Sequence, residues 1–339
     1  DDGGNIIIGT AQREVRKNDI VLIKTDKYGN QASWSPKYFG GEDDDFGRDL
    51  LVLDDGFLII GSITDDVKRD LDSYIARLDK QGNILWENSY GKLYDDEAMT
   101  IIQKQDGGFI FAGYSTNSQN QKKVYIQPVN SDGGALPSSE RGERDEQIIK
   151  LIKENPTTFL TIGTKLESDQ QFLVLKVNSD GNDFANDSYG VEGRNEIARD
   201  AVFSDNESAL FIVGTSYEDD QLNGEIYLTR INADDLSEEW AKRLSLNGIS
   251  TGNAISIMGD DKLLIAGEKQ VLDNKNIIIY IVDFEGNVIN SFEYGGSGDQ
   301  TASDVYFFNN YIIVLGNNLY EGNSMITLMK IDEDGNLWN

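Results

Sequence analysis

An internal repeat of about 50 residues constrains this chain more than any other feature of its sequence. Short apolar runs such as NIIIG, FLIIG and FIFAG close on a glycine and recur at intervals of 52, 52, 50, 51, 53 and 49 residues. The seven closing glycines are Gly9, Gly61, Gly113, Gly163, Gly214, Gly267 and Gly316. A near-constant period along the whole chain indicates one supersecondary unit that is copied seven times.

Each copy contains four strand-like segments, which we call a, b, c and d. In the second copy they are DLLVL (Asp49–Leu53), FLIIG after a DDG turn, SYIARLD (Ser73–Asp79), and ILWENSY (Ile84–Tyr90) after a KQGN turn. The segments are rich in β-branched and aromatic residues and are bounded by Gly, Asn and Asp, as strands are. Four strands per repeat predict an all-β fold, a seven-bladed β-propeller of four-stranded antiparallel blades.

We expect one propeller domain over residues 1–339. Its repeats run over approximately 1–47, 48–97, 98–145, 146–198, 199–252, 253–301 and 302–339. The chain contains seven b, seven c and seven d segments, the last d segment cut short, but only six a segments. Two explanations stay open: residues are missing at one end of the given chain, or the first blade lacks its inner strand.

Composition excludes several classes of function. The chain has 30 Lys and Arg against 59 Asp and Glu, a net charge of −29, which argues against nucleic acid as a partner. It has no Cys and no His, which excludes the usual zinc sites, thiol catalysis and every Ser-His or Cys-His arrangement. No apolar run approaches the roughly 18 residues of a membrane helix, so we expect no transmembrane segment. The oligomeric state is left open.

The loops differ between the two ends of each repeat. The a–b and c–d turns are tight, whereas the b–c and d–a connections are long, for example Phe39–Asp49 and Ser216–Glu225. In an up-and-down blade the b–c and d–a loops emerge on the same side. Any site is therefore expected among these loops, at the mouth of the central channel.

Two family resemblances rest on the repeat. The pattern D-G-G-F-I-x-x-G, then Y-x-x-K/R-x-D-x-x-G-N-x-x-W, then Y-G-G, resembles the propeller repeats of secreted and lipid-anchored envelope proteins of Bacteroidetes-type bacteria. This resemblance implies an extracellular, periplasmic or cell-surface bacterial protein, and most such proteins have no assigned activity. The segment RLDKQGNILWENS (Arg77–Ser89) is also similar to the tryptophan-docking repeat of pyrroloquinoline-quinone propellers, but the period is longer here.

Tryptophan occurs at equivalent positions of four d segments. We expect these side chains to pack between neighbouring blades, where aromatic residues bury a large area. They are Trp34, Trp86, Trp240 and Trp338.

The d–a loops repeat an acidic or amide position, at Asp44–Asp45, Asp95–Asp96, Asp145–Glu146, Asn195–Glu196 and Asp299. In one interpretation these residues form a ring of carboxylates that binds a cation or a basic ligand. In the other, each residue caps its own loop by accepting backbone N–H hydrogen bonds. Recurrence in blade after blade favours the capping interpretation, because a binding site needs asymmetry and a scaffold repeats.

The first of these loops, GGEDDDFGRD (Gly40–Asp49), is the most acidic. Adjacent carboxylates repel one another unless they are solvated or neutralised, so Asp43, Asp44 and Asp45 are a candidate Ca²⁺ site, with a solvated charge run as the other interpretation.

Aromatic and charged residues on the long loops are the ligand-binding candidates: Phe46, Arg48, Tyr94, Asp95, Arg144, Arg194, Tyr217 and Tyr320. We predict a non-catalytic binding or scaffold propeller of the bacterial envelope or exterior that presents its b–c and d–a loops to a protein or glycan. The alternative is a carbohydrate-active enzyme, a histidine-free lyase or glycosidase, at the channel mouth. No catalytic residue stands out for it.

The segment KIDEDGN (Lys330–Asn336) matches the opening of a calcium loop. Its sister copies, such as KTDKYGN and RLDKQGN, lose the second acid, and the chain ends before the bidentate Glu that such a loop requires. The segment therefore predicts a c–d hairpin turn in which Gly or Asn supplies the residues of positive φ.

Overall fold

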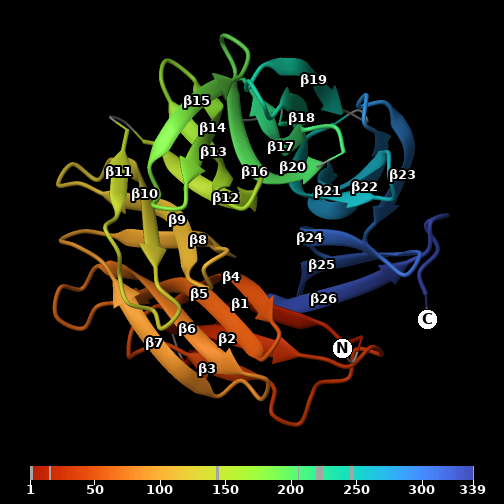
Figure 1. Cartoon of the computed structure of the whole chain (residues 1–339). Coiled ribbons are helices and arrows are strands. Elements are labelled where there is room, and N and C mark those ends of the chain that lie inside the picture. Colours follow the sequence, from red (N-terminus) through yellow and green to blue (C-terminus); the bar gives the residue numbers. More distant parts are fainter. Residues whose placement is uncertain are drawn as a thin grey trace. The chain divides into compact units, whose positions relative to one another are not determined.

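The computed structural model describes residues 3–14, 17–142, 145–204, 206–218, 224–244 and 248–338. Within these ranges the regular structure is entirely β-strand, arranged in seven sheets that follow one another along the chain (Figure 1). The succession confirms the predicted all-β, seven-bladed β-propeller.

The strands have the following bounds. The first sheet contains β1 (Ile6–Glu14), β2 (Lys17–Lys24) and β3 (Lys37–Phe39). The second contains β4 (Phe46–Leu53), β5 (Gly56–Thr64), β6 (Leu71–Asp79) and β7 (Ile84–Tyr90). The third contains β8 (Asp96–Gln103), β9 (Phe109–Thr116), β10 (Lys122–Val129) and β11 (Ser139–Arg141). The fourth contains β12 (Gln147–Lys153), β13 (Thr158–Leu166), β14 (Gln170–Asn178) and β15 (Asp183–Tyr189).

The remaining sheets belong to the second half of the chain. The fifth contains β16 (Asn195–Ser204), β17 (Ala209–Tyr217), β18 (Glu225–Asn232) and β19 (Glu238–Leu244). The sixth contains β20 (Ser250–Met258), β21 (Lys262–Val271), β22 (Asn274–Asp283) and β23 (Val288–Tyr294). The seventh contains β24 (Gln300–Phe308), β25 (Tyr311–Tyr320) and β26 (Asn323–Ile331).

The first and seventh sheets have three strands each among the described residues. The first sheet begins with its b strand, as one of the two sequence explanations expects. In the seventh sheet the d position is reduced to an isolated bridge between Ile331 and Leu337.

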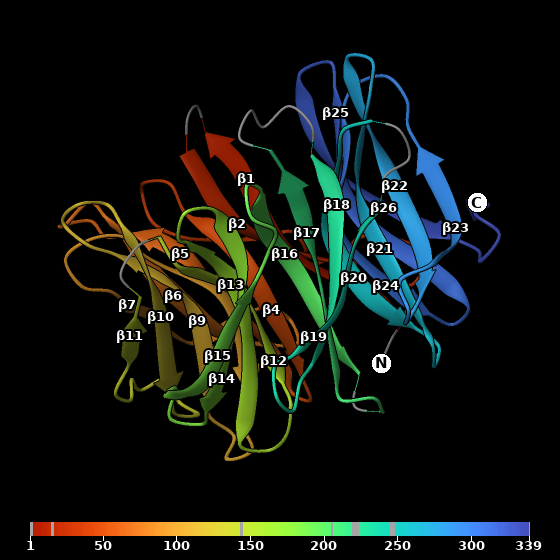
Figure 2. The ribbon, with the colours of Figure 1, turned by 90° about the horizontal axis from the view of Figure 1, so that it is seen from above.

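The chain divides into two compact units, residues 1–161 with 175–185 and residues 162–174 with 186–339. In the first unit β4 lies beside β8 and β8 beside β12. In the second unit β16 lies beside β20 and β20 beside β24, as Figure 2 shows for their sheets. The a strands of neighbouring sheets are therefore in contact within each unit.

A β-bulge near the start of the a strand recurs in these sheets. The register shifts between Gly47 and Asp49 in β4, and at the equivalent positions of β8, β16, β20 and β24. The residue after the bulge links its strand to the next sheet: Asp49 Oδ2 accepts from Ile101 N at 3.1 Å, and Thr100 Oγ1 accepts from Leu151 N at 3.1 Å. These bonds connect a strands that do not pair as a sheet.

Tryptophans of the d strands pack between sheets, as predicted. Trp86 of β7 contacts the apolar cluster of Phe109 and Phe111 in the next sheet. A Cβ on Gly133, in the c–d turn of that sheet, would lie 2.7 Å from Trp86 Cζ3, and Tyr90 Oη donates to the Gly133 carbonyl at 2.5 Å. The same contact joins Trp34 to Gly82 and Trp240 to Gly286. Trp338 differs: it is half-exposed and its ring lies 5.8 Å from that of Tyr311 in its own sheet.

The KIDEDGN segment forms the expected hairpin turn after β26. The Asp332 carboxylate accepts from the backbone N–H of Asp334 at 3.1 Å and of Asn336 at 2.7 Å, and Gly335 has φ 86°. Hydrogen bonds from Asn336 hold the pKa of Asp332 below its usual value. Asp332 therefore orders its own turn.

Two glycines with nearly the same backbone conformation test the contact between sheets. A Cβ added to Gly133 (φ 82°) would meet the indole of Trp86, whereas a Cβ added to Gly107 (φ 83°) would have no atom within 4 Å. Both substitutions to Ala carry the left-handed backbone penalty of about 1–2 kcal/mol, but Gly133→Ala also clashes with the indole. We expect Gly133→Ala to lower the free energy of unfolding by about 2 kcal/mol more than Gly107→Ala, measured by urea denaturation. Equal losses of unfolding free energy in the two variants would show that the packing of the indole does not require a glycine in this turn.

Candidate binding surface on the b–c and d–a loops

The repeated acids of the d–a loops accept backbone hydrogen bonds. Asp44 Oδ1 accepts from Asn18 N at 2.9 Å, and Asp95 Oδ1 accepts from Leu71 N at 2.9 Å. Asp145, Asn195 and Asp299 likewise accept from a backbone N–H at the start of a c strand. This is the geometry of the capping interpretation, and it ties each d–a loop to the neighbouring b–c loop.

The three candidate calcium ligands turn to different partners. Asp43 forms an ion pair with Arg69, while Asp44 accepts from Asn18. Asp45, which is fully buried, accepts from Gly41 N at 2.6 Å and from Thr64 N at 3.0 Å, and burial raises its pKa. Within the part of the chain that the structure describes, no group of three or more acidic residues is arranged to hold a metal ion. Calcium at this loop stays a prediction.

Two of the ligand candidates meet around a buried carboxylate in the first unit. Arg48, the bulge residue of β4, lies over the Phe46 ring at 5.5 Å and donates from Nη2 to Glu97 Oε2 at 2.6 Å. Glu97 also accepts from Tyr114 Oη, and Lys122 Nζ lies 3.9 Å from the centroid of the Tyr114 ring. We call Phe46, Arg48, Glu97, Tyr114 and Lys122 the Arg48 cluster.

Burial shifts the pKa of two members of the Arg48 cluster, Tyr114 and Lys122. Burial raises the pKa of Tyr114, so its hydroxyl stays a hydrogen-bond donor. Burial also lowers the pKa of Lys122, with the Arg48 charge acting in the same direction and the Glu97 carboxylate opposing it. Glu97 and Lys122 were not among the predicted ligand residues. The signal that could have found Glu97 is its place directly after the Asp95–Asp96 pair.

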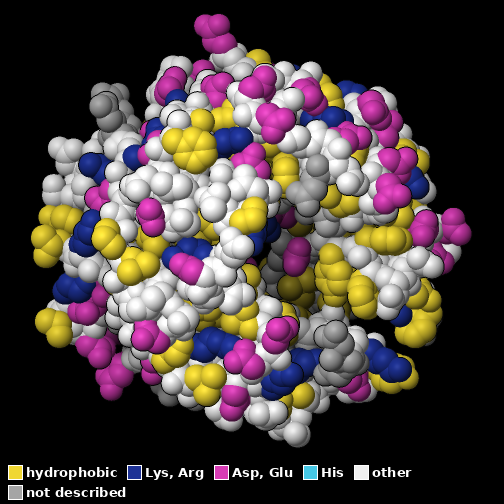
Figure 3. Space-filling view, viewed as in Figure 1, with side chains coloured by type: hydrophobic (Ala, Val, Ile, Leu, Met, Phe, Trp, Pro, Cys, Tyr) yellow, Lys and Arg dark blue, Asp and Glu magenta, His cyan; other side chains and the backbone are white. Residues whose placement is uncertain are grey.

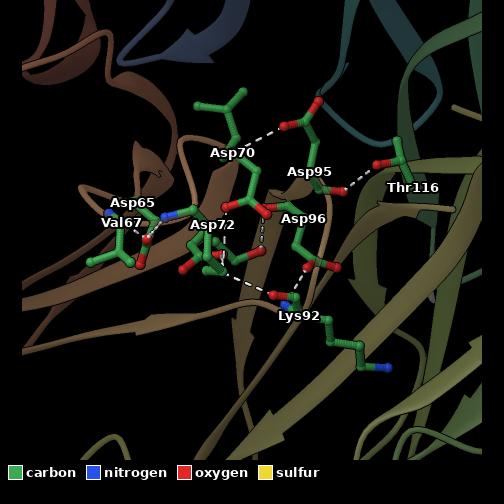
Figure 4. Close-up of polar contacts among 11 residues, drawn as sticks. Asp65, Val67, Asp70, Asp72, Lys92, Asp95, Asp96 and Thr116 are labelled. Atoms are coloured by element: carbon green, nitrogen blue, oxygen red, sulfur yellow. Dashed lines mark hydrogen bonds and ion pairs between the residues drawn. The ribbon is translucent and has the colours of Figure 1, made fainter. Parts of the chain in front are cut away.

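Acidic residues of two neighbouring loops gather beside this cluster's sheets. Figure 4 shows Asp96 beside the backbone of Lys92, with Asp70 and Asp72 from the preceding loop in the same region. Lys68 Nζ lies 2.7 Å from Asp72 Oδ1 and 3.4 Å from Asp70 Oδ1, and donates to the Lys92 carbonyl at 2.9 Å. Asp70 and Asp72 were not singled out in the sequence, because acids are common on every loop of this chain.

Asp96 is the most buried member of this group, with 1 % of its surface exposed. Its Oδ2 accepts from Lys92 N at 2.7 Å, whereas its Oδ1 is buried without a hydrogen-bond partner. Burial raises the pKa of Asp96 to about 6, and the nearby Asp72 charge acts in the same direction.

In the second unit Arg194 and Tyr217 lie on the same kind of loops. Arg194 donates to Ser216 Oγ at 2.8 Å and pairs with Glu218 at 3.0 Å and Glu225 at 3.2 Å. Tyr217 Oη donates to Gln170 at 2.8 Å, and burial raises its pKa. Both side chains are held by loop contacts. Tyr94 is 44 % exposed, as a ligand-binding residue should be.

Two of the predicted ligand residues fall outside what is described. Arg144 lies outside the described residues, and of Tyr320 only the backbone, at the end of β25, is described. Their roles as ligand-binding residues stay predictions.

Hollows occur at both ends of the blades. One of about 390 Å³ lies among the a–b and c–d turns, lined by Asp55, Arg77 and Phe109 among others. Another of about 500 Å³ lies in the second unit beside the Gly295–Ser297 loop, lined by Tyr294 and Gln300 among others. The end of the blades with the a–b and c–d turns, where the sequence predicts no site, therefore also has a concave region.

On the face drawn in Figure 3, acidic side chains are scattered with Lys and Arg between them. The described residues include no helix with the length and apolarity that crossing a membrane demands.

Comparison with known proteins supports the fold alone. No protein-family model matches the chain, and no curated protein matches it in sequence. The β-propeller domain of the Trilobed protease from Pyrococcus furiosus, described as having an open velcro topology, is similar in structure with a TM-score of 0.51 and 10 % identity, covering 98 % of this chain and 97 % of that one. A protein of unknown function from Dyadobacter fermentans is similar with a TM-score of 0.53 and 10 % identity, covering 97 % and 95 %.

The buried Asp96 carboxyl predicts a pH-dependent stability. Because its folded pKa of about 6 exceeds the ordinary 3.8, the folded protein binds more protons than the unfolded chain between these values. Asp96 therefore destabilises the fold increasingly as the pH rises from about 4 to above 6. We expect Asp96→Asn, which can still accept from Lys92 N, to gain about 2 kcal/mol over the wild type between these pH values in urea denaturation. The exposed Asp180→Asn variant is the control, and parallel pH profiles for Asp96→Asn and wild type would contradict the prediction.

Proposed function

We propose that this chain is a non-catalytic binding or scaffold propeller that presents its b–c and d–a loops to a protein or glycan partner, in the bacterial envelope or exterior. The observation that carries the proposal is the set of hydrogen-bonded caps that join each d–a loop to the adjacent b–c loop, such as Asp95 to Leu71. Loops ordered before binding lose little conformational freedom on association, which favours affinity.

The Arg48 cluster supplies suitable contact groups at this surface. The Arg48 side chain is one-third exposed and lies on an aromatic ring, and Arg and Tyr are the side chains that most often dominate binding energy. Tyr94 adds an exposed aromatic on a neighbouring loop. The envelope or exterior location rests on the repeat's resemblance to secreted propellers.

A paired substitution tests the surface. We expect Arg48→Ser with Tyr94→Ser to weaken binding of a captured protein or array glycan at least about tenfold. The control is Lys80→Ser with Val52→Ser, which removes one exposed cation and one exposed apolar residue at the turn end of the same sheet. Binding would be measured by surface plasmon resonance, after circular dichroism shows that both variants fold.

Three outcomes would count against the proposal. Equal loss of binding in the control would move the surface to the turn end. Failure of the wild type to bind any protein or glycan would remove the binding function. Turnover of a polysaccharide by the purified chain would show that it is an enzyme.

Calcium belongs to the same proposal as a structural ion at Asp43, Asp44 and Asp45. Its test is a rise in the melting temperature of the wild type with added Ca²⁺ that Asp43→Asn abolishes. Identical melting with and without Ca²⁺ would dismiss it.

A further inference from the structure

Three loops of the first unit are bound into one surface. They are residues 40–45, 64–72 and 91–96, which we call the acidic loop surface. Thr64 Oγ1 donates to the Asp44 carbonyl at 2.6 Å, and Arg69 pairs with Asp43. Lys68 Nζ donates to the Lys92 carbonyl at 2.9 Å. Each loop is therefore held to another by side-chain contacts.

Negative charge dominates the acidic loop surface. Its three loops contain ten acidic residues against Lys68, Arg69 and Lys92. Within it, Asp70 and Asp72 share one ammonium group, that of Lys68, while Asp96 accepts from the backbone N–H of Lys92. One cation cannot neutralise two carboxylates, and ten acids outnumber three cations over the whole surface, so it keeps an excess of negative charge.

Part of this charge is buried without hydrogen bonds. Both carboxylate oxygens of Asp70 and Oδ1 of Asp96 are buried without a hydrogen-bond partner in the described structure. Asp96 is 1 % exposed and the Asp70 side chain 12 %. A buried carboxylate without partners costs free energy, and a further cation would recover it.

Apolar side chains stand on the same loops in contact with solvent. Val67 is 90 % exposed, Leu93 is 77 % exposed and Tyr94 is 44 % exposed. Val67 neighbours Lys68 in the chain, and Leu93 and Tyr94 follow Lys92, so the hydrogen bond from Lys68 to the Lys92 carbonyl ties their two loops together. Exposed apolar residues with charged neighbours are typical of a protein interface.

We infer that the acidic loop surface binds a basic segment of a protein partner, whose apolar side chains contact Val67, Leu93 and Tyr94 and whose Lys or Arg approaches Asp70, Asp72 and Asp96. This inference rests on the proposed binding function and selects the protein partner over the glycan. The chain's own Lys68 shows the chemistry that the carboxylates accept, an ammonium held between Asp72 and Asp70. Charge complementarity of this kind also speeds association.

The probe is a synthetic peptide of alternating Lys and Leu, compared with peptides of alternating Lys and Ser and of alternating Glu and Leu. We expect the Lys-Leu peptide to bind best, because it meets both the charge and the apolar side chains, and the Glu-Leu peptide not to bind. Binding should weaken as salt rises from about 0.05 to about 0.5 M, because the Debye length falls to a few ångströms. Fluorescence anisotropy of labelled peptide measures each case.

Matched variants locate the binding. We expect Asp70→Asn to weaken the Lys-Leu peptide about tenfold, and Val67→Ser with Leu93→Ser to weaken it at least as much. Asp180→Asn and Val52→Ser remove an exposed acid and an exposed apolar residue elsewhere and should leave binding unchanged. The Asp70 side chain makes an ion pair with Lys68 but no hydrogen bond, and circular dichroism of Asp70→Asn checks that the variant folds.

Several results would overturn the inference. Equal weakening by Asp180→Asn would show attraction to the net charge alone. Binding of Ca²⁺ that raises the melting temperature of the wild type but not of Asp70→Asn would make the cluster a metal site. A partner that loses binding on Arg48→Ser with Tyr94→Ser but not on Asp70→Asn or Val67→Ser with Leu93→Ser would keep the proposed function and reject this surface, whereas a wild type without any partner would reject both.

Discussion

The contact of a d-strand aromatic with a bare glycine turn in the next sheet holds successive blades together. Trp86 and Tyr90 leave β7 toward the third sheet, where the indole covers Gly133 and the phenol donates to its carbonyl. A side chain on that glycine would occupy the space of the indole. The repeated Gly of the c–d turn and the repeated aromatic of the d strand are therefore two halves of one contact.

The contact tolerates different residues on both sides, and at one turn it forms without a glycine, because Tyr189 Oη donates to the Leu236 carbonyl at 2.7 Å. Phe292 takes the place of tryptophan against Gly335, and Tyr294 donates to the Gly335 carbonyl at 2.7 Å. Ser139 donates to the Gly181 carbonyl at 2.5 Å where the short β11 offers no large aromatic. At the inner strands, Asp49, Thr100 and Asp200 bond to the next sheet. With the sheets held at these points, the long loops are free to carry residues that serve binding.

Acidic residues illustrate how one residue type serves two purposes. Asp45 and Asp96 occupy equivalent positions and both accept from a backbone N–H of their d–a loop. Asp45 satisfies its other oxygen with Thr64 N, whereas the other oxygen of Asp96 is left buried and unpaired next to Asp72. The capping role repeats along the chain, and the excess charge at Asp70, Asp72 and Asp96 is local to one pair of loops.

Periodic burial and local hydrogen bonding were determined by the sequence alone. Alternating apolar residues, a glycine every 50 or so positions and the Asp-x-x-Gly-Asn turns led to a seven-bladed propeller and to a hairpin at Lys330–Asn336, because neighbours in the chain determine strands and turns. Only the tertiary structure decided that Arg48 meets Glu97 and that Lys68 is shared by Asp70 and Asp72. The Arg48–Glu97 pair depends on the β-bulge of β4, which turns the Arg48 side chain toward the next sheet. The Lys68 pairs depend on how the loop folds around the carboxylates of Asp70 and Asp72. The Arg48–Glu97 pair joins sheets about one repeat apart, and the Lys68 pairs lie within one loop that a neighbouring loop holds in place through the Lys92 carbonyl. No local pattern of residues specifies either packing.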